Sequence, residues 1–151
     1  MLIVLMKLIS LVQIIGGVIG CVMTALSAMR NISAPPVFIV HIVYILLYTA
    51  AVFAGVLLWK KDAKGRSISM AIQAIQIPYI SIPALYYKFV CGTGVVLGLQ
   101  GQELTYKLFS GSYWSLSIPN RDVPAEIAIN IVAVVLFIFL FSMGRSYTTK
   151  Q

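Results

Sequence analysis

The residues of this chain that could do chemistry inside its long apolar stretches are mostly amides and hydroxyls. Ser69, Gln73 and Gln76 recur at intervals of four and three residues, which places them on one helical face. Such groups can hydrogen-bond a neighbouring helix, or they can line a path for a neutral polar solute. We therefore treat one set of residues as a candidate polar path or buried hydrogen-bond cluster: Ser69, Gln73, Gln76, Pro78, Pro83, Asn130 and His41.

The arrangements that catalysis or metal binding requires are absent from the sequence. It contains no phosphate-binding loop, no nucleophile–base pair and no paired carboxylates. His41 is the single histidine, and we expect it to act as a hydrogen-bonding group. Cys21 and Cys91 do not form a CxxC pair. We expect no catalytic residue, no cofactor and no metal, and we rank a membrane enzyme last among the functions considered.

Composition indicates an integral membrane protein. The chain has 151 residues, of which 60% are hydrophobic and 10% are charged, and its mean hydropathy is +0.97. A soluble domain of this length could not bury so much apolar surface. Residues 18–21 match the pattern that precedes a lipidated cysteine, but the apolar run continues past Cys21, so we expect no lipidation there.

A basic loop predicts the orientation. Residues 59–66 hold four of the eleven basic residues, and short basic loops stay on the cytoplasmic side. The resulting threading puts a formal charge of +6 inside and +1 outside, within the total of +7. We expect a multi-pass protein of the cell membrane, the bacterial inner membrane, with both termini cytoplasmic. The excess positive charge fits anionic lipid headgroups and not nucleic acid.

The apolar stretches predict an all-α membrane fold. Four transmembrane helices are expected at about 8–28, 37–58, 68–89 and 124–143, and Pro78 and Pro83 should kink the third. Period-two patterns at 95–100, 104–109 and 113–118 predict a small antiparallel meander within an outer loop, residues 91–122. The whole chain, 1–151, is expected to form one domain. Asn130 is expected to bond the broken stretch of the third helix.

Small residues recur every four positions in the first two spans. They allow close approach of helix backbones, and we expect packing at Gly16, Gly20, Thr24, Ala51 and Gly55. This packing lies either within one bundle or, as the less favoured alternative, in a homodimer, so a homo-oligomer remains possible.

Two functions from different classes fit these features. The first is a non-catalytic protein that recognises a membrane subunit or a polypeptide, as an accessory or immunity-type protein does. Its candidate partner surface is a set of outer aromatic residues: Tyr86, Tyr87, Tyr106, Tyr113 and Trp114. These aromatics fit an interfacial belt against membrane lipids at least as well. The second function is a small oligomeric channel or facilitator for a neutral polar solute, built around the proline-broken third helix.

Overall fold

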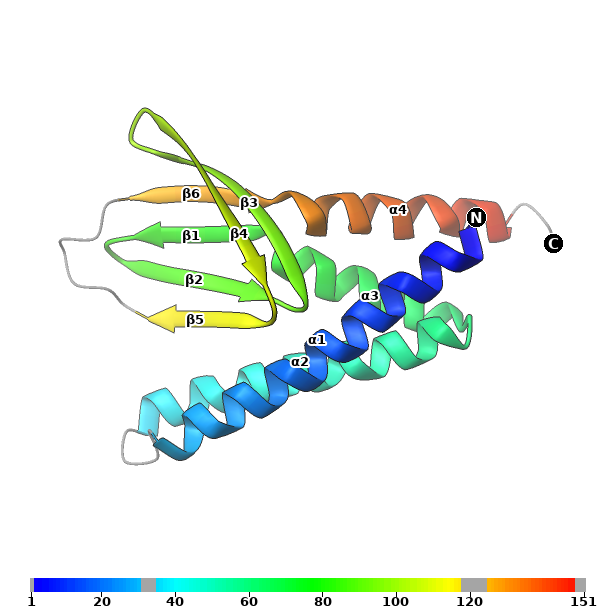
Figure 1. Cartoon of the computed structure of the whole chain (residues 1–151), viewed down its shortest axis with the longest axis horizontal. Coiled ribbons are helices and arrows are strands. Elements are labelled where there is room, and N and C mark those ends of the chain that lie inside the picture. The colour runs from blue at the N-terminus through cyan, green and yellow to red at the C-terminus, as the bar shows by residue number, and fades with distance from the viewer. Residues whose placement is uncertain (1, 31–34, 118–124, 149–151) are drawn as a thin grey trace.

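The computed structural model describes residues 2–30, 35–117 and 125–148, and it combines helices with one antiparallel sheet (Figure 1). The described helices are α1 (Leu2–Arg30), α2 (Pro35–Trp59), α3 (Ala63–Gln76) and α4 (Ile131–Thr148). The strands are β1 (Pro78–Ile82), β2 (Leu85–Val90), β3 (Thr93–Gln100), β4 (Glu103–Ser110), β5 (Tyr113–Ser117) and β6 (Glu126–Asn130). The predicted all-α class is therefore wrong.

Two of these helices, α1 and α2, are long and apolar enough to cross a membrane. They have 29 and 25 residues, which correspond to about 44 and 38 Å at 1.5 Å per residue. They lie side by side as an antiparallel pair (Figure 1). The first two predicted spans, 8–28 and 37–58, fall inside these helices.

The third predicted span, 68–89, is not one kinked helix. Helix α3 ends at Gln76, and the chain continues as strand β1, a turn and strand β2. Pro78 is the first residue of β1, where its missing N–H is tolerated, and Pro83 lies in the turn between Ile82 and Leu85. Pro78 thus marks the end of a helix and Pro83 the turn of a hairpin. The β-branched and aromatic residues beside these prolines favour strands.

The fourth predicted span, 124–143, is also part strand. Residues Glu126–Asn130 form β6, and α4 begins only at Ile131. The apolar part of α4 within the described residues, Ile131–Met143, is shorter than a full membrane crossing. Its predicted start at residue 124 lies outside the described residues. Figure 1 shows β6 and α4 running almost in line.

The sheet has the strand order β4-β3-β6-β1-β2-β5, and all its pairs are antiparallel. Strands were expected at 95–100, 104–109 and 113–118, and β3, β4 and β5 lie there, with residue 118 outside the described part. The expected meander is nevertheless wrong, because β5 pairs with β2 and not with β4. Strands β4 and β5 are opposite edges of the sheet, yet only Gly111 and Ser112 separate them. The sheet must therefore curl until its two edges meet at this end.

Glycines set the closest contacts between α1 and its neighbours. A Cβ added at Gly20 would lie 2.4 Å from the Tyr48 ring, and one added at Gly55 would lie 2.8 Å from Ile14. Gly16 instead faces the sheet, since a Cβ there would lie 2.4 Å from the amide nitrogen of Gly92. Thr24 and Ala51, from the same predicted set of packing residues, are fully buried.

Aromatic side chains join the sheet to α2. Tyr44 stacks on Trp114 with ring centroids 4.6 Å apart, and Tyr48 packs on Phe89 with centroids 5.0 Å apart. The two tyrosine hydroxyls donate hydrogen bonds to the carbonyl oxygens of Ser115 and Val90, respectively. One half of the sheet, β2 and β5, is therefore fixed against the middle of α2.

Candidate binding site on the concave face of the sheet

Side chains alternate between the two faces of the curled sheet. Cross-strand pairing puts Thr105 and Lys107 of β4, Glu126 of β6 and Tyr79 of β1 on the same face. This face is concave, because Lys107 reaches Tyr79 although two strands separate β4 from β1. A polar cluster thus forms from segments far apart in the sequence.

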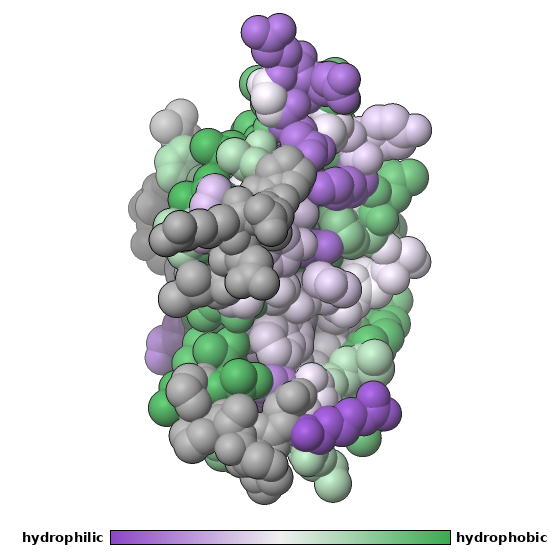
Figure 2. Space-filling model, turned by 90° about the vertical axis from the view of Figure 1, so that its left-hand side faces the viewer, coloured by the Kyte–Doolittle hydropathy of each residue, from purple (hydrophilic) through white to green (hydrophobic). Residues whose placement is uncertain are grey.

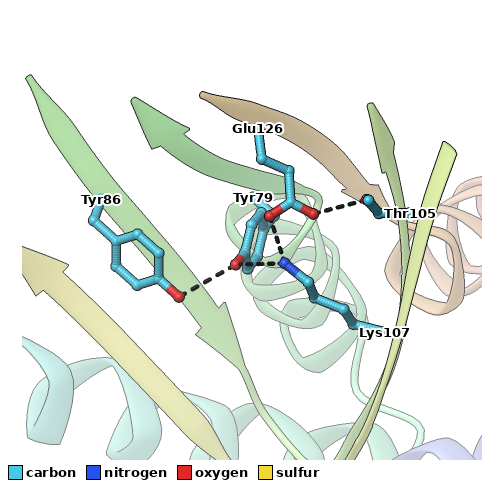
Figure 3. A network of polar contacts seen from close by, with 5 residues as sticks. All are labelled: Tyr79, Tyr86, Thr105, Lys107 and Glu126. Atoms are coloured by element: carbon cyan, nitrogen blue, oxygen red, sulfur yellow. Dashed lines mark hydrogen bonds and ion pairs between the residues drawn. The ribbon is translucent and has the colours of Figure 1, made fainter. Parts of the chain in front are cut away.

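The centre of this concave cluster is an ion pair between Lys107 and Glu126 (Figure 3). Thr105 Oγ1 donates a 2.8 Å hydrogen bond to the other carboxylate oxygen of Glu126. The Lys107 ammonium also donates to the Tyr79 hydroxyl at 3.2 Å, and the hydroxyls of Tyr79 and Tyr86 lie 3.2 Å apart. The Glu126 side chain is buried, whereas that of Lys107 is 37% exposed.

The environment of this network changes the pKa values of its members. Burial raises the pKa of Glu126, but hydrogen bonds from Lys107 and Thr105 outweigh it and the net shift is downward. Glu126 therefore stays ionised at neutral pH. Burial and the hydrogen bond to Tyr79 raise the pKa of Tyr86 to about 12, so its hydroxyl keeps its proton and can act as a donor.

Lys88 lies on the same concave face and is the unusual residue of the site. It belongs to β2 and is only 5% exposed. Its ammonium lies 3.5 Å from the ring centroid of Phe109 and 3.8 Å from that of Tyr113. Within the described part of the chain, no carboxylate forms an ion pair with it. Two aromatic faces thus take the place of a counter-ion.

The pKa of Lys88 is lowered from 10.5 to about 8, mainly by burial and secondly by the positive charge of Lys107, while Glu126 acts in the opposite direction. Lys88 is therefore mostly protonated at neutral pH, but its charge is costly to keep. An anionic group placed beside it would remove that cost. Lys88 is therefore the candidate anion-binding residue of the concave face.

The predicted polar residues of 68–89 and Asn130 fall mainly at the seam between the helices and the sheet. Gln76 Oε1 accepts a hydrogen bond from the backbone N–H of Cys91, and the backbone N–H of Asn130 donates to the Ile77 carbonyl. The Asn130 side chain accepts from the Ala133 amide at 3.4 Å and so caps α4, whereas the expected bond to the broken stretch of the third predicted span is made by the backbone of Asn130 and not by its side chain. Ser69 and Gln73 are buried in α3.

Other predicted members of that set lie elsewhere. The Nδ1–H group of His41 donates a hydrogen bond to the Val37 carbonyl, and its Nε2 lies 2.9 Å from the Ser27 hydroxyl. The His41 ring packs edge to face with that of Trp114. Pro83 occupies the β1–β2 turn, away from the seam. Gln13 of α1 was not predicted, yet it is 2% exposed and neither polar atom of its side chain has a partner in the described residues.

The five aromatic residues predicted as a partner surface do not form one surface. Tyr86 and Tyr113 lie on the concave face, whereas Tyr106 is 75% exposed on the convex face. Tyr87 donates a hydrogen bond to the Ile75 carbonyl, and Trp114 packs on α2, so both face the helices.

Lys88, Lys107, Thr105 and Glu126 were not predicted as site residues. For Thr105, Lys107 and Glu126 the signal was alternation, because each belongs to a run in which polar or small residues alternate with apolar ones, whereas no such alternation surrounds Lys88. Comparison of the chain with protein-family models, with curated proteins and with solved structures finds no match. The site is therefore interpreted from its own chemistry.

Proposed function

We propose that this protein is a non-catalytic membrane protein that recognises a polypeptide partner on the extracytoplasmic side, and that the concave face of its sheet receives an acidic group of that partner. Helices α1 and α2 would cross the membrane as a hairpin, with the basic loop at residues 59–66 on the cytoplasmic side. That orientation follows from the positive-inside rule and puts the sheet toward the outside.

The observation that carries this proposal is the position of Lys88. The Lys88 ammonium is nearly buried against two aromatic rings, and its pKa is lowered to about 8. Burial makes the charged form unfavourable, and an anion beside it would stabilise that form. Charge-assisted hydrogen bonds to a carboxylate are among the stronger polar contacts in proteins. Tyr86 and Tyr113 beside it supply the aromatic surface that is common in protein interfaces.

The geometry favours binding over catalysis. Glu126 is the buried carboxylate on this face in the described residues, and its oxygens already accept from Lys107 and Thr105. It is therefore engaged in structure, and its lowered pKa makes it a poor base. A face with a fixed ion pair and one uncompensated ammonium is suited to holding an anion in place.

The test is binding of fluorescent peptides to the full chain in mild detergent. Peptides that carry Asp or Glu, or a free C-terminal carboxylate, should bind, and their amide counterparts should bind more weakly. Lys88→Met should abolish the difference between acid and amide peptides. Lys60→Met is the matched control, because it removes the same charge from the exposed basic loop and should leave binding unchanged. Equal binding of acid and amide peptides by the wild-type protein would contradict the proposal.

A second function, the small oligomeric channel for a neutral polar solute, is favoured by the seam between helices and sheet. Buried amide groups of Gln13, Gln76 and Asn130 have atoms without partners in the described residues. Water or a polar solute commonly satisfies such groups. Urea flux into proteoliposomes, compared between the wild type and Gln76→Leu, tests this alternative, and a wild-type flux equal to that of empty vesicles would eliminate it.

A further inference from the structure

We propose that the convex face of β3, β4 and β6 lies against the acyl chains of the outer half of the bilayer. This inference rests on the membrane insertion of α1 and α2 proposed above. It assigns lipid as the occupant of a surface that carries large, exposed apolar side chains. These residues are Leu97, Leu99, Leu104, Tyr106, Leu108, Ile127 and Ile129.

The first argument is the composition of the two faces. Leu104, Tyr106 and Leu108 are 76%, 75% and 72% exposed, whereas Thr105 and Lys107 between them point to the polar concave side. Apolar residues on the outside that alternate with polar residues on the inside are the pattern of strands that face lipid. Transfer of each exposed Leu or Ile side chain from water to hydrocarbon is favourable.

The second argument is depth. Gly16 lies halfway along α1 and packs on Gly92 at the closed end of the sheet, and Tyr48 near the middle of α2 bonds the Val90 carbonyl. The sheet runs from there beside the two helices, toward their Arg30 end (Figure 1). From Gly16 to Arg30, α1 rises about 21 Å, and the eight residues of β3 span about 26 Å. A tilted β3 therefore ends near the level of Arg30.

The third argument is continuity with the helices. Val135, Ile138 and Phe141 are exposed on α4, which continues directly from β6. Ile15, Ile19 and Val22 are likewise exposed on α1. If α1 and α2 are inserted, lipid already covers Ile19 and Val22 beside the sheet and the exposed residues of α4 beyond it, and one occupant accounts for the helices and the sheet.

The curl of the sheet protects one end of the β4 edge in this arrangement. Free backbone groups of an edge strand cannot face hydrocarbon. Where β4 ends, Phe109 lies against Tyr113 of the opposite edge, with centroids 6.2 Å apart, so this part of the β4 edge is turned toward the concave side. Seen from the end of the sheet that is remote from α4, hydrophilic and intermediate residues form a central band with hydrophobic residues on both flanks (Figure 2). In this arrangement the hydrophilic band faces the outer aqueous phase while the flanks face lipid.

The test is collision accessibility of nitroxide labels in the full chain, reconstituted in phosphatidylcholine vesicles. Labels at positions 104 and 108 should be accessible to oxygen and protected from a water-soluble nickel complex. A label at position 102, in the β3–β4 turn, should show the opposite preference. A label at position 22 on α1 reports whether the helices themselves are inserted. The background carries Cys21→Ser and Cys91→Ala, and its circular dichroism and melting are compared with the wild type.

Each result separates the inference from the proposed function. Nickel access at 104 and 108 with oxygen preference at 22 would overturn only the placement of the sheet. Protection from both reagents at 104 and 108 would show that a second copy or another protein covers the face, which also overturns it. Nickel access at position 22 would overturn both membrane insertion and the inference. If the cysteine background melts early, quenching of Leu104→Trp and Leu108→Trp fluorescence by brominated lipid, corrected for Trp59 and Trp114, gives the same decision.

Discussion

Gly16 of α1 and Gly92 of the β2–β3 turn pack backbone against backbone, and a Cβ on Gly16 would lie 2.4 Å from the Gly92 nitrogen. The contact joins the middle of the first helix to the end of the sheet where β4 and β5 meet. Ser112, in the β4–β5 link, donates a hydrogen bond to the Gly16 carbonyl and so strengthens the same junction. This junction determines how deep the sheet lies beside α1.

Gly16→Ala should therefore destabilise the protein, although alanine favours a helix over glycine by about 1 kcal/mol. The added methyl group meets backbone atoms, which cannot move aside as the end of a side chain can. We expect a lower melting temperature in detergent. Ile19→Ala, at an exposed position of α1, is the control and should melt close to the wild type. Equal or higher stability of Gly16→Ala would show that the helix–sheet contact is looser than described.

Lys88→Met should make the protein more stable at pH 7 while removing the preference for acidic peptides. The folded protein releases the Lys88 proton at about pH 8, whereas the unfolded chain holds it up to its ordinary pKa of 10.5. Between these values the unfolded state binds more protons, so wild-type stability should rise with pH. Acidic-peptide binding should fall over the same range as the ammonium loses its charge.

Chemical denaturation between pH 7 and 11 measures this effect of Lys88. The rise in unfolding free energy should be present in the wild type and in Lys60→Met, and absent in Lys88→Met. An identical pH profile for all three proteins would mean that Lys88 has an ordinary environment.

Glu126→Gln should destabilise the sheet by about 1–3 kcal/mol, because it leaves Lys107 and Thr105 with a weaker acceptor. The folded pKa of Glu126 is lowered, so its contribution is present above the ordinary value of 4.5 and is lost as the pH falls through the folded pKa. The wild type should lose stability on acidification more steeply than Glu126→Gln. Glu103→Gln, at an exposed residue at the start of β4, is the control, and parallel acid profiles for wild type and Glu126→Gln would refute the prediction.

The proposed orientation predicts that position 64 is cytoplasmic and position 102 is outside. A thiol reagent that does not cross membranes should label a cysteine at 102 in intact cells and should label one at 64 only after the cells are opened. The physical reason is the cost of translocating the basic loop at 59–66. The reverse labelling pattern would invert the topology.

The sequence by itself determined the features that depend on neighbouring residues. Length and apolar character suffice to locate α1 and α2, since apolar residues on all faces of these helices add to one long hydrophobic run. Alternation suffices to locate β3, β4 and β5, because a strand with two different faces repeats every two residues. Tyr87 and Lys88 were expected at the outer surface of the membrane, and nothing in the sequence indicated that they lie on opposite faces of a strand.

Only the tertiary structure decided the features that depend on pairing between distant segments. Residues 78–90 and 126–130 lie in stretches that were expected to be membrane helices, and their strand form arises because β1 pairs with both β2 and β6. Those pairings join residues up to about fifty positions apart, and no local period encodes them. The curl of the sheet then brings Lys88 against Phe109 and Lys107 against Tyr79. The concave site exists because two sheet edges meet, which is a property of the topology and not of any single stretch of sequence.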